Sequence, residues 1–128
     1  MKDFELWHGD CIELMKGIPD GRVDAIICDP PYGTTACKWD SVIPLEPMWK
    51  ELKRVSKNNT AIVLTCVDPF TCILGASNIK DLKYKWVWNK TRATGHLNAK
   101  KMPMKNIEDI LVFYNKQPTY NPQGIAVS

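Results

Sequence analysis

The feature that most constrains this chain is the segment Asp29-Pro30-Pro31-Tyr32-Gly33, which directly follows the apolar run Val23–Cys28. The run predicts a buried strand. Pro30 and Pro31 have no backbone N–H and a fixed φ, and each restricts the residue before it to extended conformations. The chain therefore leaves the strand as a stiff, non-helical arm with a carboxylate at its root and an aromatic ring at its tip. Because ligands of α/β sheets bind beyond the carboxyl ends of the strands, this arm is the predicted site.

The remaining apolar periodicity and turn signals predict a single α/β domain over residues 1–128 with the order β-α-β-α-β-α-β-β. Two helix starts have recognisable caps: a capping box from Asp10 to Glu13, and Asp68 as the cap before Pro69. No role is assigned to Trp39, which falls in the predicted loop 34–42. The expected strands are 4–8, 23–28, 61–66, 83–90 and 107–115, and the expected helices are 11–16, 47–56 and 69–78.

Side-chain patterns within these elements predict which residues face the core. The second helix places Met48, Trp49, Leu52 and Val55 on one face, and its basic residues Lys50, Lys53 and Arg54 are interpreted as a solvated face. Strand 83–90 alternates with period two, so its three aromatic residues share one face. Packing of that face against a helix is favoured over a base-stacking platform. The three aromatic residues are Tyr84, Trp86 and Trp88.

Composition narrows the class of protein. Five cysteines form no C-x-x-C pair, and Cys28 and Cys66 fall in strand-like runs, so both are predicted to be reduced core residues of a cytosolic protein. His8 and His96 show no ligand spacing with them, and no metal site is predicted. No apolar run approaches the roughly 20 residues that span a bilayer, and the N-terminus does not resemble a signal peptide.

Positive charge is concentrated in one part of the chain. Residues 83–105 hold seven basic residues and no acidic one, whereas residues 1–82 carry −3 and residues 106–128 carry −1. Such a segment suggests a polyanionic partner. A loop at 91–106 is too long to be a simple connector and is predicted to contact phosphates and bases, although a merely solvated loop remains the alternative. The candidate DNA-binding residues are Lys90, Arg92, His96, Asn98, Lys100, Lys101 and Lys105.

The arm Asp29-Pro30-Pro31-Tyr32 resembles the Asp-Pro-Pro-Tyr motif of DNA amino-methyltransferases, which methylate adenine N6 or cytosine N4 from S-adenosylmethionine. The resemblance extends to 8–13 and 118–122 and is closest to phage-type adenine enzymes, in which this motif precedes the cofactor glycine loop. It implies a Rossmann-like methyltransferase fold with an open, mostly parallel sheet and flanking helices. It also implies a bacterial or phage-infected host cytoplasm and a link to restriction-modification.

The resemblance assigns roles to a few residues. Asp29, Pro30, Pro31 and Tyr32 become the catalytic set, and Asp10 and Cys11, with Asp29, become candidate S-adenosylmethionine contacts. Asp29 at the head of the motif, in place of serine, favours adenine over cytosine. Double-stranded DNA is the implied substrate, and the target base must be flipped out of the duplex.

The glycine-rich cofactor loop of such enzymes has no counterpart here. Asp68-Pro69-Phe70 resembles its start but continues into an apolar helix, so it is a false match. The chain is therefore expected to hold an incomplete cofactor site and an exposed sheet edge, which a second chain or a homodimer would cover. Two other functions stay open: a non-catalytic module that binds DNA or a partner, and methylation of RNA or of a protein amide.

Overall fold

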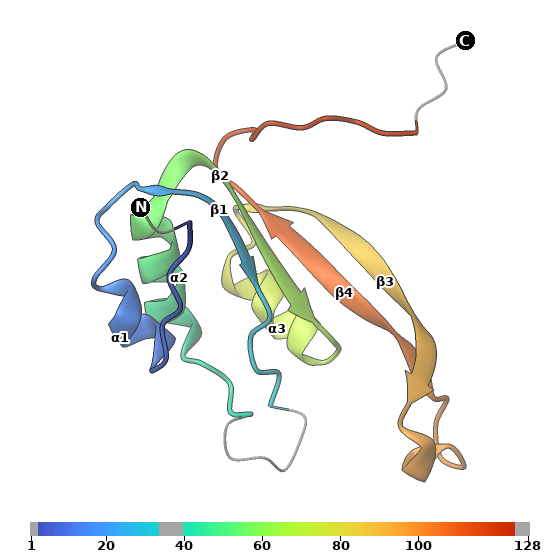
Figure 1. Ribbon diagram of the computed structural model, residues 1–128. Helices are drawn as coiled ribbons and strands as arrows, with labels where there is room; N and C mark the ends of the chain where they lie inside the picture. The colour runs from blue at the N-terminus through green and yellow to red at the C-terminus, as the bar shows by residue number, and fades with distance from the viewer. Residues whose placement is uncertain (1–2, 34–39, 125–128) are drawn as a thin grey trace.

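The computed structural model describes residues 3–33 and 40–124, which form one sheet with three helices (Figure 1). Trp39, to which the sequence assigns no role, lies outside the described residues, as does Cys37. The helices are α1 (Cys11–Met15), α2 (Leu45–Val55) and α3 (Phe70–Ser77), with a 3-10 turn, η1 (His96–Asn98), between the last two strands. The strands are β1 (Val23–Cys28), β2 (Ser56–Cys66), β3 (Leu82–Thr94) and β4 (Lys105–Phe113).

The sheet has the strand order β1-β2-β4-β3. β1 and β2 run parallel, and both pairings of β4 are antiparallel. The α/β class is confirmed, but the expectation of a mostly parallel sheet is wrong for the described strands. The reason is that β3 and β4 are joined by a hairpin rather than by a crossover helix, and a hairpin connection makes two strands antiparallel.

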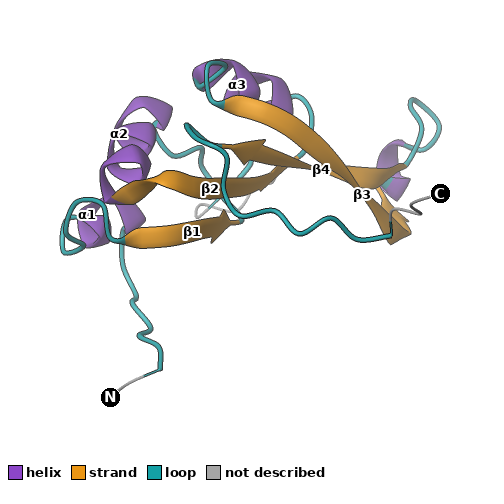
Figure 2. Ribbon diagram, turned by 90° about the horizontal axis from the view of Figure 1, so that it is seen from above, coloured by secondary structure: helices purple, strands orange, loops and turns teal. Residues whose placement is uncertain are grey.

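One face of the sheet carries α2 and α3 (Figure 2). Alternate residues of β2 point to that face, so Ile62, Leu64 and Cys66 are buried between the strands and the helices. The Trp49 ring of α2 packs edge-on against Phe113, with centroids 4.6 Å apart. The inner face predicted for α2 is confirmed. The buried residues that form this cluster are Met48, Trp49, Leu52, Ile62, Leu64, Cys66, Phe70, Leu74, Leu111 and Phe113.

The other face of the sheet, here called the open face, carries none of the three helices (Figure 2). Ile27 of β1 points to it and is 84% exposed. Trp86 on β3 is 55% exposed, and it shares this face because it pairs with Ile110, which in turn pairs with Thr65. The three aromatic residues of β3 do share one face, as predicted, but their predicted packing against a helix is wrong. The helices lie on the opposite side of the sheet.

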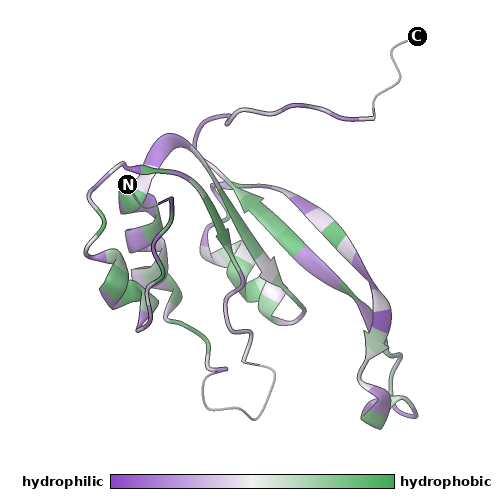
Figure 3. Cartoon of the chain, in the orientation of Figure 1, coloured by the Kyte–Doolittle hydropathy of each residue, from purple (hydrophilic) through white to green (hydrophobic). Residues whose placement is uncertain are grey.

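The β3–β4 hairpin extends beyond the rest of the sheet (Figure 1). Pairing between β2 and β4 ends at Cys66 and Asp109, and β4 begins four residues earlier, at Lys105. At about 3.3 Å per residue, the hairpin projects about 13 Å past the carboxyl end of β2 before its tip begins. The predicted loop 91–106 is therefore mostly hairpin strand and 3-10 turn. Figure 3 shows hydrophilic and apolar residues mixed along this hairpin, whereas the second half of β2 is mainly apolar.

Three local predictions are wrong. Residues 4–8 form no strand, since no neighbouring strand pairs with them, and Leu6 is exposed. α3 begins at Phe70, so Asp68 lies one residue outside the cap position, and its carboxylate instead accepts a hydrogen bond from the Cys72 thiol. Arg54 is not a solvated side chain. Its guanidinium contacts Asp20 and Glu51 and donates to the carbonyls of Met15 and Ile18, which ties α2 to the segment before β1.

Candidate active site

Three polar side chains meet where β1 and β2 end. Cys28 pairs with Leu64 in the parallel register, which places Asp29 level with Thr65. The Thr65 hydroxyl donates to Asp29 Oδ1 at 2.6 Å. The Tyr32 hydroxyl lies 2.7 Å from Thr65 Oγ1 and 3.0 Å from the same Asp29 oxygen. The motif therefore folds back on itself, and its carboxylate and phenol share a hydrogen-bonded cluster with a residue from the neighbouring strand.

The turn after Tyr32 depends on Gly33. Its φ is +71°, in the left-handed region, and a Cβ at this position would lie 2.9 Å from Val42 Cγ2. The Gly33 N–H donates to the buried Asp40 carboxylate at 3.1 Å. Only glycine adopts this conformation at no steric cost, so the turn after Tyr32 requires a residue without a side chain.

The Tyr32 ring is held from the helix side. Phe70, the first residue of α3 and 3% exposed, stacks on it with centroids 5.7 Å apart and an interplanar angle of 27°. Burial raises the pKa of the Tyr32 phenol, and the Asp29 carboxylate raises it further, against a lowering by Thr65. Tyr32 is therefore neutral at physiological pH and acts as a hydrogen-bond donor. Asp29 itself is exposed, whereas Pro30 is buried.

Sequence reasoning does not find Thr65 and Phe70. Thr65 is the next-to-last residue of β2, and a hydroxyl at the end of a neighbouring strand could have been proposed as a partner of Asp29. Only the register between β1 and β2, however, shows that the Thr65 hydroxyl reaches the carboxylate. Phe70 reads as part of a helix start, and its contact with Tyr32 arises from tertiary packing.

The candidate cofactor residues lie at the start of α1. The Asp10 carboxylate accepts hydrogen bonds from the N–H groups of Ile12 and Glu13, at 3.0 and 3.1 Å. This half of the predicted capping box is confirmed. The other half is wrong, because the Glu13 side chain pairs with Lys16 instead of returning to residue 10. The Cys11 thiol is exposed.

The candidate DNA-binding residues all lie on the projecting hairpin, at the end of the sheet that also holds Asp29. Lys90 is engaged within the protein: it forms an ion pair with Glu108 at 3.0 Å and lies over the Trp88 ring. The other six are exposed, and none of their side chains forms an ion pair within residues 3–33 and 40–124. These six are Arg92, His96, Asn98, Lys100, Lys101 and Lys105.

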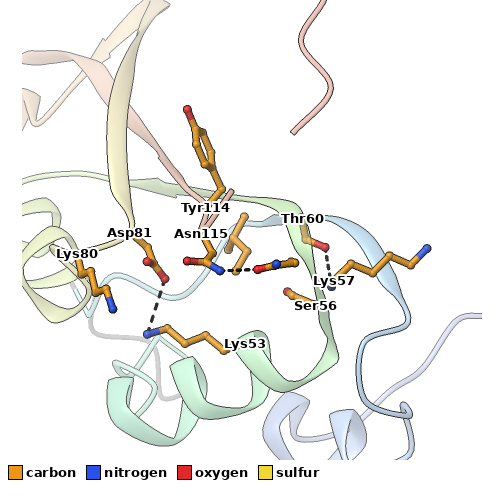
Figure 4. A pocket seen from close by; sticks show the side chains of 10 residues that line it. Lys53, Ser56, Lys57, Thr60, Lys80, Asp81, Tyr114 and Asn115 are labelled. Atoms are coloured by element: carbon orange, nitrogen blue, oxygen red, sulfur yellow. Dashed lines mark hydrogen bonds and ion pairs between the residues drawn. The ribbon is translucent and has the colours of Figure 1, made fainter. Parts of the chain in front are cut away.

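A recess of about 420 Å³ lies at the opposite end of the sheet, where β2 begins and β4 ends (Figure 4). Its lysines come from three different parts of the chain, but two of them already have acidic partners: Lys53 lies 3.8 Å from Asp81, and Lys57 contacts Asp24. The β2 residues that line the recess, Ser56 to Ile62, precede Thr65 by three to nine residues, which is about 10–30 Å at 3.3 Å per residue. The recess is therefore not part of the Asp29 cluster.

Solved structures identify the fold. The M1.HpyAVI complex with SAM superimposes on 94% of this chain with a TM-score of 0.67 and 19% sequence identity. TTHA0409 of Thermus thermophilus, described as a putative DNA modification methylase in complex with S-adenosyl-L-methionine, covers 91% with a TM-score of 0.63 and 19% identity. The PvuII DNA methyltransferase, which is cytosine-N4-specific, covers 86% with a TM-score of 0.63 and 12% identity. This chain has a DNA-methyltransferase fold.

The methyltransferase fold is present in part. The chain spans 62% of the M1.HpyAVI structure, 56% of the TTHA0409 structure and 49% of the PvuII enzyme. At the level of sequence, a stretch of 28 residues is 54% identical to the type II methyltransferase M.BamHI of Bacillus amyloliquefaciens, which is 22% of this chain and 7% of that protein. No family model matches the sequence.

Two further properties concern only the part of the chain that the structure describes. There, no group of three metal-ligating side chains comes together. Nor does that part contain a helix of the length and apolar character needed to cross a membrane.

Proposed function

We propose that this chain carries the catalytic motif of an S-adenosylmethionine-dependent DNA methyltransferase that acts on adenine N6. The observation that supports this most is the position of Asp29-Pro30-Pro31-Tyr32. The motif leaves the carboxyl end of a sheet strand, in the fold of DNA methyltransferases, with its tyrosine hydroxyl 3.0 Å from its carboxylate.

The chemistry required is the activation of a poor nucleophile. The lone pair of an exocyclic adenine amine is delocalised into the ring, so the nitrogen must be drawn toward tetrahedral geometry. The Asp29 carboxylate and the Pro30 carbonyl are two acceptors for the two amine hydrogens, and the prolines fix their directions. Both also stabilise the positive charge that develops on the nitrogen. Tyr32 contributes an aromatic surface for the base.

The choice of adenine rests on the aspartate that begins the motif. A cytosine-N4 enzyme shares the fold, so the fold does not separate the two bases. A methylated product distinguishes them directly, because N6-methyladenosine and N4-methylcytidine separate after digestion of the DNA to nucleosides.

S-adenosylmethionine supplies the methyl group when it is bound. The residues present fit only part of such a site: the Asp29 carboxylate and the start of α1, where Asp10 and Cys11 lie. No glycine-rich run follows a strand in this sequence. Asp10 is already committed to capping α1 through Oδ1, so only its second oxygen would be available to a ligand.

DNA would be contacted by the β3–β4 hairpin. The hairpin projects from the end of the sheet that holds Asp29, and its basic residues are exposed, so a duplex bound along it would bring a flipped base toward the motif. The same exposed charge favours a second candidate function, that of a DNA-binding module without catalysis.

The open face and the outer edge of β1 suit a further polypeptide segment. Parallel strands are usually covered on both faces, and an uncovered apolar edge strand is a site for pairing. Since about two fifths of the M1.HpyAVI structure has no counterpart in this chain, the expected partner is a second chain that carries the glycine loop. In the alternative, a homodimer, the second copy would cover the face and the edge without supplying that loop.

Two measurements on one sample test the function. S-adenosylmethionine is titrated into the purified chain by calorimetry, and transfer of a radiolabelled methyl group to duplex DNA is followed with and without the partner segment. Methyl transfer that yields N6-methyladenosine and is lost in Asp29→Asn supports the proposal. DNA binding that persists in Asp29→Ala, with no transfer under any condition, supports the binding module instead.

A further inference from the structure

Two residues outside the motif hold its reactive groups. Asp29 and Tyr32 are close in sequence, but their mutual geometry is fixed by Thr65 on β2 and Phe70 on α3. Both contacts cross between elements, so neither is a consequence of the motif alone.

The hydroxyl protons can be assigned from distances. Thr65 and Tyr32 each have one proton to donate. The shortest contact, 2.6 Å, joins Thr65 to Asp29 Oδ1, and the next, 2.7 Å, joins Tyr32 to Thr65 Oγ1. The consistent assignment is a chain in which Tyr32 donates to Thr65 and Thr65 donates to the carboxylate. Thr65 is the central member, because it accepts one of these bonds and donates the other.

This chain of bonds uses one carboxylate oxygen. Both side-chain contacts of Asp29 go to Oδ1, and Oδ2 has no hydrogen-bond partner within the described residues. A carboxylate held through one oxygen cannot rotate freely about its terminal bond, so the direction of Oδ2 is fixed as well. Phe70 has the corresponding effect on Tyr32, since it covers one face of a ring that is only half-buried.

We infer that Thr65 and Phe70 are positioning residues: Thr65 orients Asp29 so that Oδ2 accepts the hydrogen of an exocyclic amine, and Phe70 backs Tyr32 so that a purine stacks on its other face. This rests on the proposed function for the reaction, but the orientation itself does not require turnover. Loss of the Thr65 hydroxyl removes the shortest hydrogen bond to Asp29 Oδ1 and the acceptor of the Tyr32 proton. The carboxylate can then turn toward the Tyr32 hydroxyl, 3.0 Å away, and loses its direction, whereas loss of the Phe70 ring lets Tyr32 tilt.

The test compares Thr65→Val, which has nearly the same shape but no hydroxyl, with Thr65→Ser, which keeps the hydroxyl. Thr60→Val is the matched control, because Thr60 is also on β2 and donates to the Val23 carbonyl, remote from Asp29. With methyl transfer to duplex DNA as the readout, Thr65→Val should lower kcat about 10- to 100-fold with KM for DNA nearly unchanged, the loss typical of a misplaced reacting group. Thr65→Ser should restore most of kcat, and Thr60→Val should lower stability without lowering the kcat of the folded enzyme.

A second readout is independent of turnover. Adenosine is titrated into the labelled chain, and the NMR signals of the Tyr32 ring are followed. Wild type and Thr65→Ser should show ring-current shifts that Thr65→Val and Phe70→Leu reduce or abolish. If these shifts appear as expected while no variant transfers methyl groups even with the partner segment present, the positioning role stands and the proposed function fails. Equal shifts or equal kcat in Thr65→Val and wild type, or no shift in wild type, would overturn the positioning role.

Discussion

The two faces of the sheet should respond very differently to the loss of a side chain. Leu64 is 0% exposed in the middle of β2, against α2 and α3, so Leu64→Ala removes buried methyl groups and leaves a cavity. Such truncations lower the free energy of unfolding by about 3 kcal/mol. Ile27 is 84% exposed, so only about a sixth of its roughly 2 kcal/mol burial energy is lost in Ile27→Ala. With a modest loss of strand propensity, the total stays below about 1 kcal/mol.

The assay is urea denaturation at low micromolar concentration, followed by circular dichroism and tryptophan fluorescence. With a slope of about 1.5 kcal/mol per molar urea, the midpoint should fall by about 2 M for Leu64→Ala and by less than about 0.7 M for Ile27→Ala. If Leu64→Ala is unfolded without denaturant, Ile62→Val provides a milder truncation of the same face, of about 1 kcal/mol. Equal losses of unfolding free energy for Leu64→Ala and Ile27→Ala would refute the conclusion that the open face is uncovered. A dependence on protein concentration in that case would show that a second copy covers it.

Three other perturbations probe separate parts of the molecule. Burial raises the pKa of the Cys66 thiol to about 11, so stability should fall as pH rises from about 9 to 11, and Cys66→Ala should reduce that fall in urea midpoints. Gly33→Ala should lower the free energy of unfolding by about 1–2 kcal/mol, with part of the loss recovered by Val42→Ala in the double variant. Lys100→Ala and Lys101→Ala should each reduce the salt slope of DNA binding by about 1 without changing the urea midpoint, and Lys50→Ala should change neither.

The elements with strong local signals can be predicted from the sequence. The apolar run before Asp29 predicts β1 with the observed bounds, and the inner face of α2 follows from its periodicity. The basic hairpin is visible as a charge imbalance. In each case the signal lies within a short stretch of consecutive residues and does not depend on what packs against them.

The remaining features depend on contacts between distant parts of the chain. A period of two shows that Trp86 shares a face with its aromatic neighbours, but only the positions of α2 and α3 decide that this face is open. The place of β4 between β2 and β3 is likewise a long-range outcome. The ion pair between Arg54 and Glu51, three residues earlier, can be predicted from the sequence. The hydrogen bonds of Arg54 to the carbonyls before β1 cannot, because those carbonyls lie far away in the chain.

The hairpin has a consequence for how such a protein can change over generations. All residues from 91 to 107 are exposed, and the buried residues of the core lie elsewhere. Substitutions at the tip therefore cost little folding stability, because they remove no buried contact. The surface that would meet DNA can vary while the core and the Asp29 cluster stay the same. Under the proposed function, selection for a new recognition sequence would act on this hairpin with little risk of losing the fold.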